Sequence, residues 1–502
     1  MGIGGLNVNA AAYIMVVLGI LLAKGIGFLR DIVFASVFGA SVYTDMYFQI
    51  FGLVNLIFTG IGVALSTLVI KNLNKAQCDS DEKKRSYVSH FITKTTLVSL
   101  AAIFIMYLFS GVIVRLLLPG ISGESYGVAL KMMYIMLPSF LFVIIAYIIS
   151  GVLQNCRVFF ISSIMSLPFN VVIIASLFVK NVDIITVGIV TTIGWFLHIA
   201  VQLPSFYKKG YRLFAGGKCE KTSSGTNREL IWIFISNMMF QVCFMIDKAF
   251  VSGDSGAATT INYASNLFVT IASVFVVAMS NVVFPSISRN YEEGNTEYVR
   301  SLVKYIIVVM FVIFVPFILT VSCFGNQLIA VLYERGEFTP DLTKTTAILF
   351  AIYTMGALGY VCQELFNKLL YLDARYSYTV AGTIGVIVLK IVLNILAGGE
   401  VLVVAIITTV LFTLYAFLIA FAMKRVIGNY MDSELGKNLL KITLSGVCAF
   451  LAFIVCKTAL PTLTNGEFTF LLPLGLCAVI YITALILSGV LKTVIMRKGE
   501  GK

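Results

Sequence analysis

The segment Phe28-Leu29-Arg30-Asp31-Ile32-Val33-Phe34-Ala35-Ser36 places two charged residues inside a long apolar stretch. A related segment follows 216 residues later as Phe244-Met245-Ile246-Asp247-Lys248-Ala249-Phe250-Val251-Ser252. The same offset, without gaps, also pairs Thr44 with Thr260 and Tyr47 with Tyr263. Chance similarity between apolar helices does not predict shared polar positions. We therefore expect an internal duplication, which is common in membrane transporters.

The composition predicts a multi-helical membrane protein. The chain of 502 residues is 59% hydrophobic and only 12% charged, which excludes an ordinary soluble protein. Membrane β-barrels alternate apolar and polar residues, whereas runs such as 88–118 and 468–490 are almost continuously apolar. A spanning helix needs about 20 apolar residues, and the polar breaks delimit fourteen spans: 8–38, 45–70, 88–114, 131–153, 158–179, 184–206, 229–252, 259–287, 303–324, 346–370, 377–397, 401–423, 440–456 and 468–491.

The duplication predicts how these helices are grouped. Six helices in each copy is an even number, so both copies have the same orientation about an axis along the membrane normal. We expect an N-terminal lobe over 1–215 with a cytoplasmic linker to about 228, and a C-terminal lobe over 229–425. Two appended helices, over 438–492, and a cytoplasmic tail, 493–502, complete the chain.

The distribution of basic residues predicts the topology. Of the 36 Lys and Arg residues, 24 follow even-numbered expected helices or lie in the tail, and only six follow odd-numbered ones. Basic loops face the cytoplasm, so we expect both termini there. The net charge of +12 is then explained by topology and by attraction to anionic lipid headgroups, and nucleic acid is not implied.

Metal sites, cofactors and disulfides are not indicated. The nine cysteines are scattered without a CxxC pair, and the chain has only two histidines. These residues do not form the spacings typical of zinc sites or disulfide frameworks. No cofactor or enzymatic activity is expected.

Charged residues within the first span are the first functional candidates, because a charge in the membrane is costly unless it meets a partner or a cavity. Lys24 and Asp31 are seven residues apart, which places them on one helix face about 10.5 Å apart along the axis. Arg30 lies on an adjacent face. Two interpretations stay open: a structural pair of Arg30 with Asp31, or a cation site for an anionic substrate.

Three further sets of charges fall within the second copy. Asp247 repeats Asp31 and is followed by Lys248. Glu364 and Lys368 have the i, i+4 spacing of a structural salt bridge. Lys390 has only apolar neighbours nearby in sequence and must find a carboxylate or lose its charge, so we expect a coupling charge pair with Asp247.

At these positions the chain resembles the MurJ (MviN) family of lipid II flippases in the MOP exporter superfamily. The resemblance rests on four sets of residues: Gly27–Asp31 with Phe38–Ala40 and Thr44–Asp45; Gln202–Pro204 with Lys208–Gly210; Asn262–Ala264 with Phe284–Pro285 and Ser288–Arg289; and Leu332–Thr339. They occur in the family's order and fit its fourteen-helix topology.

The resemblance implies transport of lipid II, an undecaprenyl-diphosphate-linked peptidoglycan precursor, to the outer leaflet by alternating access. A central cavity would bind this polyprenyl-diphosphate-linked glycan, and the last two helices would form a groove for its lipid tail. The implied cavity residues are Lys24, Arg30, Asp31, Asp45, Asn55, Lys248 and Asn266. A monomer in the bacterial cell membrane, in contact with membrane lipids and cell-wall synthesis enzymes, is implied as well.

Three departures from the family pattern bear on this expectation. The family usually has two arginines where this chain has Phe58 and Thr59, and a further arginine where this chain has Asn266. Lys24 stands where an arginine is usual, which keeps the charge and loses two-pronged phosphate binding. Some members bind sodium in the neighbourhood of Lys390, so we expect the ammonium of Lys390 to replace that ion and transport to be independent of sodium.

Other functions stay open at this point. A flippase for another lipid-linked oligosaccharide, of the exopolysaccharide, capsule or O-antigen type, is the nearest alternative. A drug exporter of the same superfamily, a membrane-embedded glycosyltransferase and a structural scaffold are less well supported. The expected outer loops are short for a glycosyltransferase, and the charges within the membrane argue against a scaffold.

Overall fold

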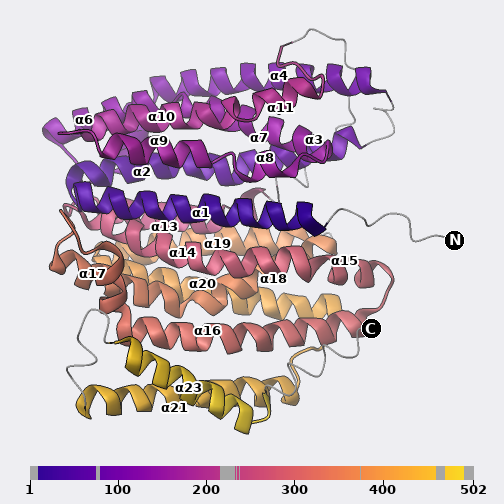
Figure 1. The fold of residues 1–502 in the computed structure, drawn as a ribbon, viewed down its shortest axis with the longest axis vertical. Helices are drawn as coiled ribbons and strands as arrows, with labels where there is room; N and C mark the ends of the chain where they lie inside the picture. The colour runs from indigo at the N-terminus through magenta and orange to yellow at the C-terminus, as the bar shows by residue number, and fades with distance from the viewer. Residues whose placement is uncertain are drawn as a thin grey trace. The chain divides into compact units, whose positions relative to one another are not determined.

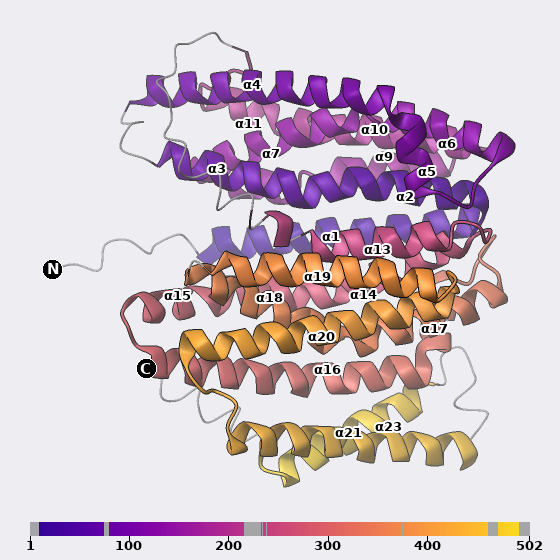
Figure 2. The same cartoon turned by 180° about the vertical axis from the view of Figure 1, so that it is seen from behind.

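The computed structural model describes residues 10–74, 80–214, 232, 234–236, 238–373, 375–459 and 470–490. These residues are helical apart from short connections, and the chain divides into two compact units, 1–259 and 260–502 (Figures 1 and 2). The expected linker between the lobes, near 215–228, and the expected tail lie outside the described residues. The lobe boundaries therefore stay a prediction.

The first unit contains the helices from α1 to α13, and the second contains those from α15 onward, with α14 beginning at the boundary. The first set is α1 Ala10–Phe38, α2 Val42–Ile57, η1 Phe58–Gly62, α3 Val63–Leu73, α4 Asp81–Leu108, α5 Ser110–Leu117, α6 Gly123–Met136, α7 Ser139–Asn155, α8 Phe159–Ser163, α9 Leu167–Leu177, α10 Ile184–Ala200, α11 Leu203–Lys208 and α13 Met239–Phe250. The second set is α14 Ala257–Val282, α15 Phe284–Glu292, α16 Thr296–Tyr333, α17 Pro340–Met355, α18 Ala357–Leu372, α19 Tyr376–Leu396, α20 Val401–Ile427, α21 Ser433–Ala459 and α23 Leu471–Leu487.

These helices confirm the all-α membrane fold expected from the sequence. Within the described residues, ten helices or near-continuous helix pairs are long and apolar enough to cross a membrane. The pair α17 and α18, bent by 42°, makes an eleventh candidate. Helices α1, α13 and α23 lie where the other three spans are expected. The exact number of fourteen spans stays a prediction.

Polar side chains mark where several helices begin. The side chains of Ser80, Asp183, Asn295 and Thr339 accept hydrogen bonds from backbone N–H groups in the first turns of α4, α10, α16 and α17. Such caps satisfy amides that have no partner within the helix. The polar breaks that delimit spans in the sequence therefore also fix the helix starts.

Glycine allows two pairs of helices to cross at close range. A β-carbon at Gly151 of α7 would lie 2.8 Å from the carbonyl oxygen of Ser66 in α3. One at Gly359 of α18 would lie 2.9 Å from the α-carbon of Thr413 in α20. Small residues allow backbones in a membrane to approach closely, where van der Waals packing drives association.

The second expected span is not a regular α-helix throughout. Between α2 and α3, residues Phe58–Gly62 form the π-helical segment η1. A β-carbon at Gly62 would lie 2.4 Å from the ring of Tyr147, so the segment packs tightly on α7. Single π turns within α-helices occur often at functional sites, and this one includes Phe58 and Thr59, where the family resemblance implies arginines.

Helices α21 and α23 pack on each other, and α21 also packs along α16 in the second unit (Figure 2). Phe324 of α16 lies between Phe453 and Phe470, with ring centroids 4.9 and 5.8 Å apart. A pocket of about 390 Å³ adjoins this cluster and is lined by residues of all three helices. Its walls are mainly apolar, which suits a hydrocarbon chain.

Candidate functional site

Arg30 and Asp31 form an ion pair on α1. The Nε and Nη2 atoms of Arg30 donate to Oδ1 of Asp31 at 3.0 and 2.7 Å. Nη1 of Arg30 donates to Oδ1 of Asn170, on α9, at 3.1 Å. The side chains of Arg30 and Asp31 are only 13% and 12% exposed. The long side chain of Arg30 thus reaches from its own helix face to the neighbouring Asp31. The hydrogen bond to Asn170 fixes the orientation of the guanidinium.

Two aromatic rings complete the surroundings of Arg30. Its guanidinium carbon lies 5.5 Å from the ring centroid of Phe51 on α2 and 5.7 Å from that of Phe169 on α9. These distances are within the range of cation–π attraction, which is strongest where water is excluded. The site therefore holds a cation against apolar walls. Asn170, Phe51 and Phe169 were not expected from the sequence, because neither spacing nor charge links them to Arg30.

The other expected residues on these helices have varied surroundings. Lys24 of α1 and Asn55 of α2 are partly buried. Asn266 of α14 is also partly buried, in the second unit. Their grouping in one substrate cavity stays a prediction.

Asp45, near the start of α2, is 1% exposed and binds the beginning of α14. Its Oδ2 accepts from the backbone N–H of Gly256 at 2.7 Å, and its Oδ1 accepts from the N–H and hydroxyl of Thr259, both at 2.6 Å. Thr44 adds a hydroxyl contact of 2.8 Å to Thr259. A negative charge at the first turn of a helix is favourable because of the amides and dipole there. Asp45 was expected to line the cavity, and the structure gives it these helix-capping contacts.

Helix α13 packs on α2 through polar groups as well as apolar ones. Asp247 is 0% exposed and Lys248 is 3% exposed. The ammonium of Lys248 donates to the carbonyl oxygen of Phe48 at 3.4 Å. The side-chain amide of Gln49 donates to the carbonyl oxygen of Met245 at 3.0 Å. Lys248 also lies within electrostatic range of Asp45 and Asp247, so this packing brings the expected cation close to two of the expected acids.

Lys390 is fully buried within the second unit. Its ammonium donates to the hydroxyl of Thr408, on α20, and Asn394, one turn along α19, is also fully buried. The sequence did not single out Thr408, because a threonine in an apolar helix has no distinctive signal. The expected pairing of Lys390 with Asp247 joins the two units and stays a prediction.

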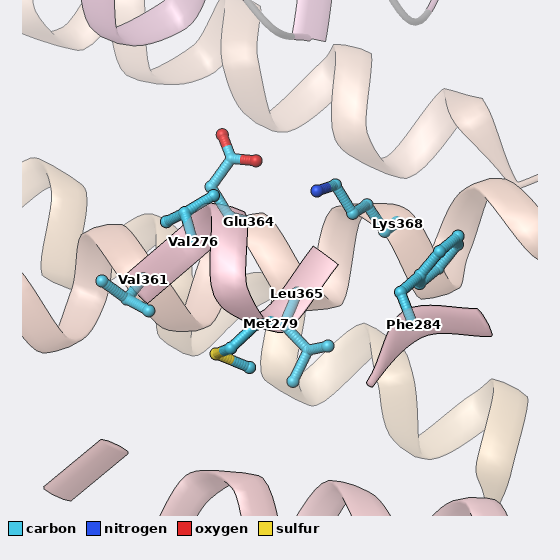
Figure 3. Close-up of a pocket in the computed structure, with 7 residues that line it drawn as sticks. All are labelled: Val276, Met279, Phe284, Val361, Glu364, Leu365 and Lys368. Atoms are coloured by element: carbon cyan, nitrogen blue, oxygen red, sulfur yellow. The ribbon is translucent and has the colours of Figure 1, made fainter. Parts of the chain in front are cut away.

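Glu364 and Lys368 line a pocket of about 230 Å³ in the second unit (Figure 3). Both residues belong to α18 and are partly buried. Figure 3 shows their charged ends on one side of the pocket, with the apolar side chains of Met279 and Leu365 on the other. The expected salt bridge between them stays a prediction.

Acids and thiols are dispersed over the part of the chain that the structure describes. No three or more His, Cys, Asp or Glu side chains there could together hold a metal ion. The buried charges described above can bind, orient or neutralise charged groups. This chemistry is that of a binding or transport site.

Comparison with known proteins decides the family. The family described as "Lipid II flippase MurJ" matches residues 34–486. The chain belongs to the lipid II flippase MurJ family. A probable lipid II flippase MurJ of Buchnera aphidicola is 26% identical over 368 residues, covering 70% of each chain. The lipid II flippase MurJ of Burkholderia cenocepacia is 24% identical over 387 residues, covering 73% of this chain and 74% of that protein.

Solved structures confirm the fold. A lipid II flippase MurJ in an inward closed conformation superposes with a TM-score of 0.76 at 23% identity, covering 95% of this chain and 99% of that one. An inward-facing MATE family transporter of the MOP superfamily gives a TM-score of 0.61 at 12% identity, covering 84% of this chain and 95% of that one. The family match over residues 34–486 confirms the family resemblance inferred from short motifs. The protein is a multi-pass membrane protein of a transporter family.

Proposed function

We propose that this protein transports lipid II from the inner to the outer leaflet of the bacterial cell membrane by alternating access. Its membership of the MurJ family carries this proposal. The buried charges of the first unit support it, because a diphosphate crossing the membrane needs fixed cations in a site shielded from lipid.

Lys24, Arg30 and Lys248 are the proposed diphosphate ligands. Arg30 is held by Asp31 and Asn170 under two aromatic rings, so it is oriented before substrate arrives. A pre-oriented guanidinium loses little entropy on binding phosphate. In the absence of substrate, Asp31 balances the charge, and the diphosphate competes with it for Arg30.

The pocket beside Phe324, among α16, α21 and α23, is the proposed position for part of the prenyl chain. Its apolar walls match a hydrocarbon tail, which has no need to leave the lipid phase during transport.

A depletion experiment tests the proposal. A bacterium whose own lipid II flippase can be switched off receives this gene, its Lys24→Ala variant or its Lys94→Ala variant. Lys94 is an exposed cation on α4, so it controls for the loss of one positive charge. We expect growth with the wild type and Lys94→Ala, and lysis with Lys24→Ala at equal membrane abundance.

Lysis with the wild type at good membrane expression would count against lipid II as the cargo. Reconstituted vesicles then separate host incompatibility from the wrong cargo, since flipping of purified lipid II there needs no host partner. Failure in both settings would contradict the proposal and favour another lipid-linked oligosaccharide.

The contacts of Asp45 are proposed to act as a latch. They tie the start of α2 to the turn before α14 and to its first residues, on the side that the charge distribution assigns to the exterior. In this proposal, these hydrogen bonds break when the site opens to that side. Variants that weaken the latch should therefore shift the protein toward the outward-open state.

Lys390 is proposed to make transport independent of sodium. A fully buried ammonium that donates to Thr408 supplies the positive charge that a bound ion would otherwise provide. Transport would then be driven by membrane potential or a proton gradient. Strict dependence of flipping on sodium, compared with potassium in the same vesicles, would refute this.

The proposed setting follows from the family and the charge distribution. Both termini are placed in the cytoplasm, the protein acts as a monomer, and cell-wall synthesis enzymes supply and consume its cargo. Labelling from either side of the membrane tests the topology, with one cysteine introduced near each terminus of a variant whose nine native cysteines are replaced.

A further inference from the structure

Helix α16 contains a proline, Pro316, far from either end of the helix. Proline has no N–H, so the carbonyl oxygen of Val312, four residues earlier, lacks the donor that a regular helix would give it. Helix α16 is long and apolar enough to cross a membrane, and the hydrocarbon interior supplies no water to replace that donor. The carbonyl of Val312 therefore needs a partner from another helix.

Tyr481 of α23 provides this partner. Its hydroxyl donates to the carbonyl oxygen of Val312 at 3.0 Å. Tyr481 is only 4% exposed, so this hydrogen bond is shielded from competing groups. Neighbouring helices commonly satisfy the backbone groups that a proline frees in a membrane helix. The proline of α16 and the tyrosine of α23 thus complete each other.

A second break in α16 also meets the appended helices. Phe324 has non-helical backbone angles, with φ −122° and ψ 16°. Its ring centroid lies 5.8 Å from that of Phe470, at the start of α23. Phe470 precedes Tyr481 whereas Phe324 follows Val312, so α16 and α23 run antiparallel. The stretch of α16 between its two breaks is therefore held to the appended helices at both ends.

This stretch of α16 is one wall of the proposed tail pocket. Pro316 and Phe324 both line the pocket, and Tyr481 lines it from α23. The other contacts along this wall are mainly apolar. Apolar contacts are not directional, so they allow α23 to slide along α16, whereas a hydrogen bond fixes its position. The hydroxyl of Tyr481 thus sets the position of α23 at the end of the pocket opposite Phe324.

We propose that Tyr481 is a positioning residue for the prenyl chain of the cargo. By satisfying the carbonyl that Pro316 leaves open, it fixes α23 on α16 and sets the shape of the tail pocket. This inference rests on the proposed function and adds a specific contact to it. The hydroxyl acts on the chain through the apolar walls that it holds in place.

A double-mutant cycle in the full-length protein tests the contact. Tyr481→Phe keeps the ring and removes the hydroxyl, so Val312 loses its donor and the thermal unfolding midpoint should fall. Pro316→Ala restores an N–H that can bond to Val312 within α16. In the Pro316→Ala background, Tyr481→Phe should therefore lower the midpoint much less.

Tyr430→Phe is the matched control. The hydroxyl of Tyr430 donates to the carbonyl oxygen of Ala420 at 2.7 Å. Ala420 lies inside α20, where the N–H of Lys424 is its helical donor. The effect of Tyr430→Phe should thus be the same with proline or alanine at position 316. An equal drop in midpoint from Tyr481→Phe in both backgrounds would overturn the proposal.

Binding in lipid nanodiscs tests the role in positioning the chain. The probes are lipid II with its undecaprenyl chain and the same molecule with a short farnesyl chain. For each probe, the affinity of Tyr481→Phe is divided by that of the wild type, which cancels partitioning of the chain into the nanodisc lipid. We expect the undecaprenyl form to bind about fivefold more weakly, which corresponds to one hydrogen bond of about 1 kcal/mol. The farnesyl form gains less from the walls, so its affinity should change less than about twofold.

The two probes separate positioning from a general structural role. An equal loss of affinity for both probes, or no loss for either, overturns the positioning role and leaves lipid II transport intact. Failure of the wild type to bind either probe overturns the proposed function and the positioning of the chain with it.

Discussion

Replacing Asp45 should destabilise the protein far more than replacing an exposed helix cap. In Asp45→Ala, the amides of Gly256 and Thr259 lose their acceptor, while the Thr259 hydroxyl keeps its contact with Thr44. A buried N–H left without a partner costs about 1–3 kcal/mol, so two of them should lower the free energy of unfolding by about 2–6 kcal/mol. Asp45→Asn keeps one acceptor oxygen but places its NH2 group opposite one of these N–H donors. The free energy of unfolding should then fall by about 1–3 kcal/mol.

Asp183 provides the matched comparison. It is exposed and accepts from the backbone N–H of Thr186 at 3.0 Å, at the start of α10. Asn is as good a cap as Asp, and loss of an N-cap costs about 1 kcal/mol. Asp183→Asn should therefore be nearly neutral and Asp183→Ala mildly destabilising.

Thermal unfolding of the four variants in one detergent, at one pH, measures the difference. The drop in unfolding midpoint should be several times larger for Asp45→Ala than for Asp183→Ala. Equal and small drops at both positions would refute the reasoning, because the buried amides would then have found other partners. An unfolding midpoint of Asp45→Asn equal to that of the wild type would show that stability does not require the second carboxylate oxygen.

Three further predictions concern packing, pH and the cation site. Gly151→Leu should lower the yield of folded protein in size-exclusion chromatography, because its side chain would collide with the backbone of Ser66; an unchanged elution profile would contradict the close crossing. The ammonium of Lys304 donates to Asp432 and holds the pKa of that carboxyl below its ordinary value of 3.8. The stabilisation by Asp432 should thus be complete above pH 3.8 and disappear as the pH falls through the lower pKa of the folded state. The thermal unfolding midpoints of the wild type and Asp432→Asn should therefore converge only in strong acid. Arg30→Lys keeps the charge but loses the two-pronged contact with its neighbouring carboxylate, and it should fail to support growth in flippase-depleted cells at normal abundance; full growth would show that charge alone suffices.

The membrane fold could be predicted because its signals are local. Apolar runs and polar breaks delimit the helices, and the repeat of Asp31 at Asp247 indicated the duplication without any knowledge of packing. The pairing of Arg30 with Asp31 was foreseen as one of two interpretations, since the residues are adjacent in sequence. The π-helical conformation of η1 could not be predicted, because nothing in the sequence distinguished this segment from an ordinary α-helix.

The partners of the charged residues could not be predicted. Asp45 binds backbone amides more than 200 residues away, and an amide has no signature in the sequence. Asn170 and Thr408 are ordinary polar residues until the fold brings them to Arg30 and Lys390. Long-range hydrogen bonding thus decides how each buried charge is satisfied.

The π-helical segment η1 makes the second span sensitive to its length in residues. A π turn holds about one residue more than an α turn, so deleting one residue within Phe58–Gly62 would let α2 and α3 join as a regular helix. Every side chain of α3 would then be rotated by about 100° relative to α2. Ser66 would leave its crossing with Gly151, and α7 would meet a different face of α3. The extra residue therefore rotates α3 relative to α2 about the axis of the second span. The face that α3 presents to α7 is thus set separately from the face that α2 presents to its own neighbours.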